Sequence, residues 1–112
     1  ALNSRLVKDA SGRLHEEVWR VGGRYGGTLA RVVRHLDAAR QVAPPATAAA
    51  LEALIRFYRS GEEEDRRAYD IAWVQDAAPP VDTINGFIEV YLDARGIKGA
   101  WEGLVFHENP EK

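Results

Sequence analysis

The chain has 112 residues, of which 46% are hydrophobic and 29% charged, the composition of one ordinary globular domain. Its formal net charge of -2 gives no argument for nucleic-acid binding, and no apolar run approaches the roughly 18 residues of a membrane span. The absence of cysteine excludes disulfides and thiolate metal sites and is compatible with a cytoplasmic location. Because the chain starts with alanine and contains no methionine, we expect it to be an excised part of a longer protein.

The first residues predict a short hairpin. Residues 6–8 and 13–18 flank Asp9-Ala10-Ser11-Gly12, a run of turn-forming residues. The glycine-rich residues 22–27 that follow lack the spacing of a phosphate-binding loop, and we interpret them as a flexible or closely packed start of a helix.

Two amphipathic helices come next. Hydrophobic residues recur with helical spacing over residues 29–36 and again over 51–58. Pro44-Pro45 separates the two predicted helices, and Gly61 predicts the end of the second one. The two helices together form a helical hairpin. The candidate N-cap residues are Thr28 and Thr47.

A third helix is predicted after Gly61. Residues 62–65 are four consecutive acids, which the helix dipole favours at an N-terminus. The apolar residues that complete this helix are expected to be buried against the helical hairpin; they are Tyr69, Ile71, Ala72, Trp73 and Val74.

The segment 86–91 is rich in β-branched and aromatic residues, which predicts a strand. Side chains alternate across a strand, so Phe87, Glu89 and Tyr91 should share one face and line a groove. The opposite face holds Ile88 and Val90, which we expect to be buried beneath the helices.

A second strand is predicted over residues 99–106, and it carries Glu102 beside Trp101. The connection contains Asp93-Ala94-Arg95-Gly96, which suits a type I turn, so the two strands form a long-looped hairpin. The fold class is therefore α+β, a single domain over residues 1–112 in which a helical hairpin and a third helix pack on a small antiparallel β-hairpin.

Glu89 and Glu102 are the candidate binding residues. If the two strands pair, their carboxylates approach each other and repel, unless one takes up a proton or a cation arrives. The α-amino group of a peptide, with a reference pKa of about 8, is such a cation. Two carboxylates around it would measure the distance from the N-terminus to the bond to be cut. From the residues alone, the alternative that both acids simply face water is equally compatible.

The sequence contains no complete set of residues for a metal site or for nucleophilic catalysis. His15, His35 and His107 are far apart and no H-E-x-x-H motif is present, so no metal site is expected on this chain. Without cysteine or a G-x-S-x-G motif, no catalytic residue is expected either.

The segment around the two acids resembles a known family. The runs G-F-I-E-V-Y-L-D (residues 86–93) and K-G-A-W-E-G (98–103), with Gly96 between them, are similar to the segment that precedes the zinc motif in the dipeptidyl-peptidase III family. Ala94 departs from the family pattern, which usually has proline there, so the turn should be less rigid. Residues 19–23, 71–76 and 81–82 resemble the bacterial branch of the family.

The resemblance implies a zinc-dependent aminopeptidase that releases dipeptides from peptide N-termini. It implies that Glu89 and Glu102 hold the free amine and that Tyr91 lines the same cleft. The zinc ligands and the general acid/base of the family lie outside this chain, which resembles part of the lobe opposite the zinc. Zinc would thus be a cofactor of the parent enzyme and not of this chain.

The partners implied are short peptides and the zinc lobe, with an exposed strand pairing with the peptide backbone. Two alternatives stay open: a non-catalytic peptide-binding or interaction module of the same architecture, and a purely structural helical domain that carries a hairpin. An H-E-x-x-x-H helix further along the parent protein would favour the peptidase.

Overall fold

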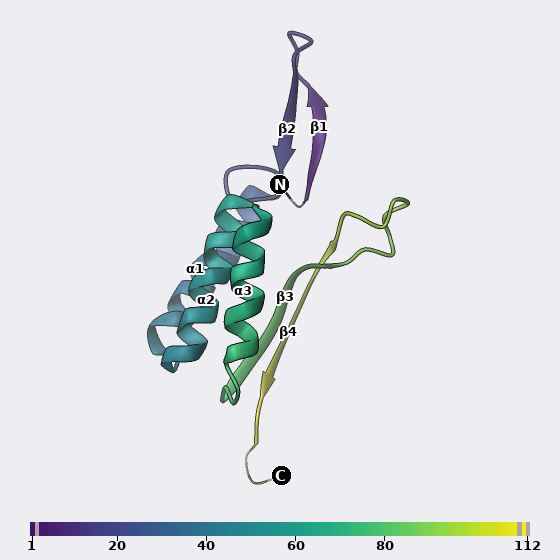
Figure 1. Cartoon of the computed structure of the whole chain (residues 1–112). Helices are drawn as coiled ribbons and strands as arrows, with labels where there is room; N and C mark the ends of the chain where they lie inside the picture. Colours follow the sequence, from purple (N-terminus) through teal and green to yellow (C-terminus); the bar gives the residue numbers. More distant parts are fainter. Residues whose placement is uncertain (2, 110, 112) are drawn as a thin grey trace. The chain divides into compact units, whose positions relative to one another are not determined.

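The computed structural model describes residues 1, 3–109 and 111. The elements follow in the order β1 (Ser4–Lys8), β2 (Leu14–Val18), α1 (Gly26–Val42), α2 (Pro45–Ser60), α3 (Glu63–Gln75), β3 (Val81–Glu89) and β4 (Ala100–His107) (Figure 1). They form two compact units, Ala1–Asp76 and Ala77–Lys112, called the N-terminal and C-terminal unit below. Helices and small antiparallel sheets in one chain confirm the predicted α+β class. That the chain is one domain, with the helices packed on the second hairpin, stays a prediction.

The predicted first hairpin is confirmed. β1 and β2 are antiparallel, with Lys8 opposite Leu14. The turn is organised by the Asp9 carboxylate, which accepts hydrogen bonds from the backbone N–H groups of Ser11 and Arg13, both at 2.9 Å, and from the Ser11 hydroxyl at 2.6 Å. The Ser11 hydroxyl and these backbone groups lower the pKa of Asp9.

Both predicted threonine caps are wrong, although the helices themselves are confirmed. α1 begins at Gly26, and α2 begins at Pro45, whose fixed φ and missing N–H suit the first helical position. Thr28 and Thr47 therefore lie inside their helices, and the Thr47 hydroxyl instead donates to the Asp76 carboxylate at 2.6 Å.

The end predicted for α2 is confirmed at Gly61. This glycine has a left-handed φ of 70°, and its N–H donates to the Phe57 carbonyl at 2.7 Å. The left-handed conformation is the usual way to end a helix, and glycine adopts it without a steric penalty.

The core of the N-terminal unit is centred on α2, which packs against both α1 and α3 (Figure 1). Leu54 and Tyr58 of α2 are fully buried at 0% exposure, and Leu29, Val33 and Tyr69 from the other two helices are buried with them. Burying one such large apolar side chain is worth about 1.5–3 kcal/mol, so this contact holds the three helices together. Across the described residues, no helix is both long and apolar enough to cross a membrane.

The apolar residues predicted to complete α3 do not all face the core. Tyr69 is buried, as predicted, but Ile71 is 52% and Val74 72% exposed, and Trp73 is 37% exposed. A helix turns once in about 3.6 residues, so a run of consecutive apolar residues cannot share one face. The prediction of burial is therefore wrong for Ile71, Trp73 and Val74, and Ala72 is only half-buried.

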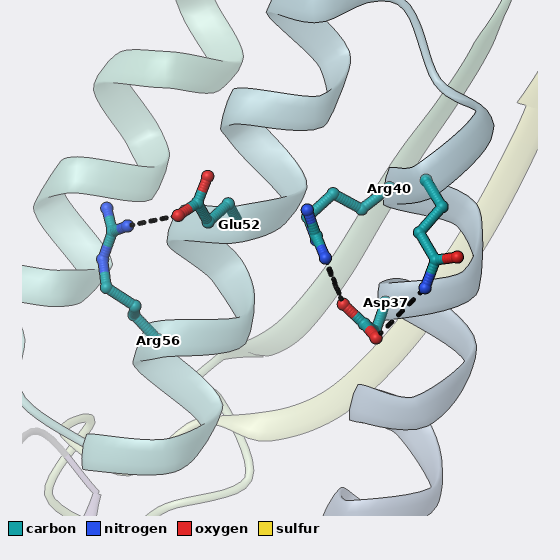
Figure 2. Close-up of polar contacts among 5 residues, drawn as sticks. Asp37, Arg40, Glu52 and Arg56 are labelled. Carbon is teal, nitrogen blue, oxygen red and sulfur yellow. Dashed lines mark hydrogen bonds and ion pairs between the residues drawn. The ribbon is translucent and has the colours of Figure 1, made fainter.

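Pairs of charged residues lie along the outer surfaces of α1 and α2 (Figure 2). Asp37 accepts a hydrogen bond from Arg40 at 2.8 Å and a weaker one from Gln41 at 3.5 Å, and Arg56 lies 3.7 Å from Glu52. Each pair joins residues three or four positions apart, which are neighbours on a helix surface. The Arg40 guanidinium lowers the pKa of Asp37. Such exposed pairs add little stability, so the packing of α2 remains the main source of it.

The C-terminal unit is the second hairpin, also as predicted. β3 and β4 are antiparallel, with Val81 opposite His107 and Phe87 opposite Trp101. Beyond the strands, the Glu108 N–H donates to the Pro80 carbonyl at 3.1 Å. β3 begins five residues earlier than the predicted strand and ends at Glu89, so the candidate site lies at its end.

Candidate functional site

The two candidate acids lie on the same face of the β3–β4 hairpin. Glu89 is directly opposite Ala100 in the antiparallel register. Side chains alternate along β4, so Ala100 and Glu102 point to one side of the sheet, and a residue opposite Ala100 points to that side too. Glu89 and Glu102 are therefore diagonal neighbours on the two paired strands, two positions away from being directly opposite each other. Residues in this arrangement are typically about 7–8 Å apart.

A β-bulge produces this arrangement. Phe87 pairs with Trp101 and Glu89 with Ala100, which leaves Ile88 as an extra residue in β3. In a regular ladder Glu89 would lie opposite residue 99 and point to the side of Phe87, away from Glu102. The prediction that Phe87 and Glu89 share a face is therefore wrong, and the register shift is what places Glu89 on the face of Glu102.

Both carboxylates are accessible. Glu89 is exposed and Glu102 is half-buried. Gly86 lies directly opposite Glu102 and has no side chain that could cover it. A primary ammonium carries three hydrogen-bond donors, and an ionised carboxylate only accepts. Two carboxylates on one open face can thus hold an ammonium group between them.

Tyr91 is not on the strand. β3 ends at Glu89, so Tyr91 lies in the connection, where it is 76% exposed. Its predicted exposure is confirmed, whereas its predicted place in the strand alternation is wrong because the pairing stops two residues earlier. Val90 also lies beyond the strand and is 37% exposed, and Ile88, the extra residue of the bulge, is only half-buried, so the prediction that both are buried is wrong.

The connection between the acids is organised by Asp93. One oxygen of its carboxylate accepts the backbone N–H groups of Ile97 at 2.9 Å and Lys98 at 3.0 Å. The Asp93 carbonyl also accepts the N–H of Gly96 at 2.9 Å, which confirms the predicted turn. The backbone donors of Lys98 and Ile97 hold the pKa of Asp93 below its usual value. The sequence indicated Asp93 as a turn residue, but not that its side chain reaches across the loop.

Gly99, which the sequence did not single out, touches the bulge. It is buried, and a Cβ added to it would lie 2.6 Å from both the carbonyl carbon and oxygen of Phe87, and 3.0 Å from the Ile88 nitrogen. A glycine at the start of a predicted strand was the available signal, because glycine often marks a close approach of two backbones.

The described residues do not fit a zinc site. Over residues 1, 3–109 and 111, no group of three or more histidine, cysteine, aspartate or glutamate side chains is placed to hold a metal ion. His15, His35 and His107 are exposed and lie on β2, α1 and β4. We therefore assign no reaction step through zinc to this chain.

Comparison with known proteins shows the family. Residues 4–112 match peptidase family M49. The dipeptidyl peptidase 3 of Mus musculus is 32% identical over 105 residues, which cover 93% of this chain and 14% of the mouse protein. That of Nematostella vectensis is 33% identical over 84 residues, 74% of this chain and 12% of the relative. That of Dictyostelium discoideum is 39% identical over 61 residues, 54% of this chain and 9% of the relative.

The chain thus spans between 9% and 14% of the length of these relatives. Its assignment to the bacterial branch stays a prediction. The match over nearly the whole chain confirms the resemblance to dipeptidyl-peptidase III, and the chain belongs to peptidase family M49.

Proposed function

We propose that this chain is the amine-binding segment of a zinc-dependent dipeptidyl peptidase, an enzyme that removes dipeptides from the N-terminus of peptides. Membership of peptidase family M49 supports the class of enzyme. The observation that carries the role of this segment is the register of β3 and β4, which places Glu89 and Glu102 on one accessible face.

The physical basis is charge pairing at a fixed position. The two carboxylates accept hydrogen bonds from the protonated α-amino group, and their negative charges are compensated when it binds. A peptide with a blocked N-terminus leaves both carboxylates without that cation. Because the amine is fixed, the distance from it to the bond that is cut is fixed as well, which accounts for the release of dipeptides.

Tyr91 and the edges of the hairpin complete the proposed peptide site. Tyr91 projects from the connection just beyond β3 and would line the same cleft, where its hydroxyl can donate or accept a hydrogen bond. In the described residues the sheet has two strands, so each of them is an edge strand of that sheet. Such an edge can pair with an extended peptide backbone.

The chemistry belongs to other parts of the proposed enzyme. The cofactor zinc, its ligands and the general base would come from the zinc lobe, the second partner of this segment, and the location would be the cytoplasm. This chain supplies recognition of the free N-terminus and no catalytic residue.

The test is Glu89→Gln in the full-length protein that contains this chain. The change keeps the shape of the side chain and removes its charge. Hydrogen bonds to charged groups are worth about 1.5–3 kcal/mol, so kcat/KM for a dipeptidyl arylamide should fall roughly ten- to hundredfold. The zinc content, measured by atomic absorption, should not change.

Glu108→Gln is the matched control, because Glu108 is exposed and lies beyond the end of β4. It should leave kcat/KM unchanged. A Glu89→Gln protein with the wild-type rate at low substrate concentration would exclude the proposed contact.

A further inference from the structure

We infer that Gly99 is a positioning residue for the amine site. Because it has no Cβ, the backbone of the bulge can lie close to the backbone of Gly99, and this contact holds Glu89 on the face of Glu102. This inference rests on the proposed function and adds to it a residue that does not touch the amine. It comes from two independent features of the C-terminal unit, the register of the hairpin and the space around Gly99.

The first feature is the steric environment of Gly99. An added Cβ would stand 2.6 Å from the carbonyl carbon and oxygen of Phe87, closer than such atoms approach each other in proteins. The atoms that it meets are backbone atoms, which cannot rotate away as the end of a long side chain can. Any residue other than glycine at position 99 therefore pushes the backbone at Phe87 and Ile88 away.

The second feature is the position of the register shift, which falls between Phe87 and Glu89, where Gly99 makes its close approach. Without the bulge, Ile88 would pair with Ala100 and Glu89 with residue 99. A shift of one residue sends a side chain to the opposite face of a sheet. Glu89 would then point to the side of Phe87 and Trp101, and the ammonium would keep one carboxylate instead of two.

Gly99→Ala is therefore expected to change selectivity for the free amine. The probes are dialanine and N-acetyl-dialanine, with their binding to the full-length holoenzyme measured by calorimetry. We expect the wild type to prefer dialanine, and Gly99→Ala to reduce that preference about tenfold or more, as for the loss of one charged contact. Binding of N-acetyl-dialanine should not change, whereas a general loss of folded protein would weaken both equally.

Gly27→Ala is the matched control, because a Cβ at Gly27 has no atom within 4 Å. It should leave the preference for dialanine as it is in the wild type. A wild-type protein without any preference would refute the proposed function. A selective wild type together with an equally selective Gly99→Ala protein would refute only the role of Gly99.

Deletion of Ile88 supplies a rescue. Without the extra residue, regular pairing brings Glu89 opposite Ala100, on the face of Glu102, and residue 99 no longer faces a bulge. The Ile88 deletion combined with Gly99→Ala should therefore recover the selectivity that Gly99→Ala loses. If Gly99→Ala alone does not fold, the double variant decides: selective binding supports the inference. A folded double variant without selectivity, or one that does not fold, overturns it.

Discussion

The two units of this chain hold their shape by different means. In the N-terminal unit, α2 lies in a packed core in which Leu54 and Tyr58 have no exposed surface. In the C-terminal unit, large apolar side chains of β4 are exposed to solvent; these are Trp101 at 45%, Leu104 at 54%, Val105 at 73% and Phe106 at 48% exposure. A two-stranded hairpin has no room for a core of its own.

Directional contacts add to packing in the C-terminal unit, where Phe87 is buried. The buried Asn85 side chain donates to the Thr83 hydroxyl at 3.0 Å, and that hydroxyl donates across the sheet to the Leu104 carbonyl at 3.0 Å. The Asp93 carboxylate closes the connection in the same way. The face to which the Glu89 side chain points is thus decided by backbone geometry, through the bulge and Gly99. Substitutions that change the backbone should therefore affect amine binding more than substitutions that change side-chain packing.

The largest expected effect comes from the core of the N-terminal unit. Leu54→Ala removes a fully buried side chain and leaves a cavity, so the free energy of unfolding should fall by about 2–5 kcal/mol. Chemical denaturation followed by circular dichroism measures the change. The same substitution at Leu104 should stay within about 0.5 kcal/mol, because that side chain is 54% exposed. Equal losses at both positions would break the distinction between the two units.

A smaller effect is expected where the end of α2 meets β2. Gly61→Ala and Gly22→Ala both place alanine at a left-handed φ, of 70° and 83°, which costs about 1–2 kcal/mol. At Gly61 the new Cβ would also lie 2.5 Å from a methyl carbon of Val18, whereas at Gly22 no atom lies within 4 Å. Gly61→Ala should therefore destabilise the protein by about 1 kcal/mol more, at the low end for overpacking. Equal melting temperatures of the two variants would show that this contact relaxes at no cost.

The helices and hairpins could be predicted from the sequence because their signals are local. Repeats of apolar residues over 29–36 and 51–58 mark the two helices, and the runs that begin at Asp9 and Asp93 mark the turns. The N-caps were missed because both helices begin two residues before their threonines, at Gly26 and Pro45, without a side-chain cap. The exposed residues of α3 were missed because a run of apolar residues does not show which of them faces α2.

That Glu89, Tyr91 and Glu102 form a binding site stays a prediction. The register puts Glu89 and Glu102 on one face, as expected, but Phe87 does not share that face. An acid between aromatic residues drew attention to Glu89, but strict alternation placed it on the face of Phe87. The bulge depends on how closely the backbone at Gly99, just before β4, approaches β3, and the sequence of β3 alone does not contain that distance. The strand also ends before Tyr91, because a turn begins at Val90, whose carbonyl accepts a hydrogen bond from the N–H of Asp93.

The smallest expected effect is local, and it compares the two hairpin connections directly. Asp93 in the C-terminal unit and Asp9 in the N-terminal unit each accept two backbone N–H groups through the side chain, and each has a lowered pKa. A lowered carboxyl pKa means that the bonds stabilise the charged form. The contribution of these hydrogen bonds to the free energy of unfolding is complete above the ordinary aspartate pKa of about 3.9. It is lost as the pH falls through the lower pKa of the folded state.

Amide chemical shifts followed by NMR during an acid titration test this sign at both turns. The signals of Ile97 and Lys98 should move with a midpoint below the ordinary carboxyl range, and those of Ser11 and Arg13 should do the same as an internal reference. Asp93→Asn keeps an acceptor oxygen but does not titrate, so the movement at Ile97 and Lys98 should disappear while their hydrogen bonds persist. Asp93→Ala removes the bonds themselves, and these two amides should exchange with solvent faster at neutral pH. If the midpoint at Ile97 and Lys98 lies at the ordinary value while that at Ser11 and Arg13 is lowered, the Asp93 carboxylate does not hold the connection that carries Tyr91.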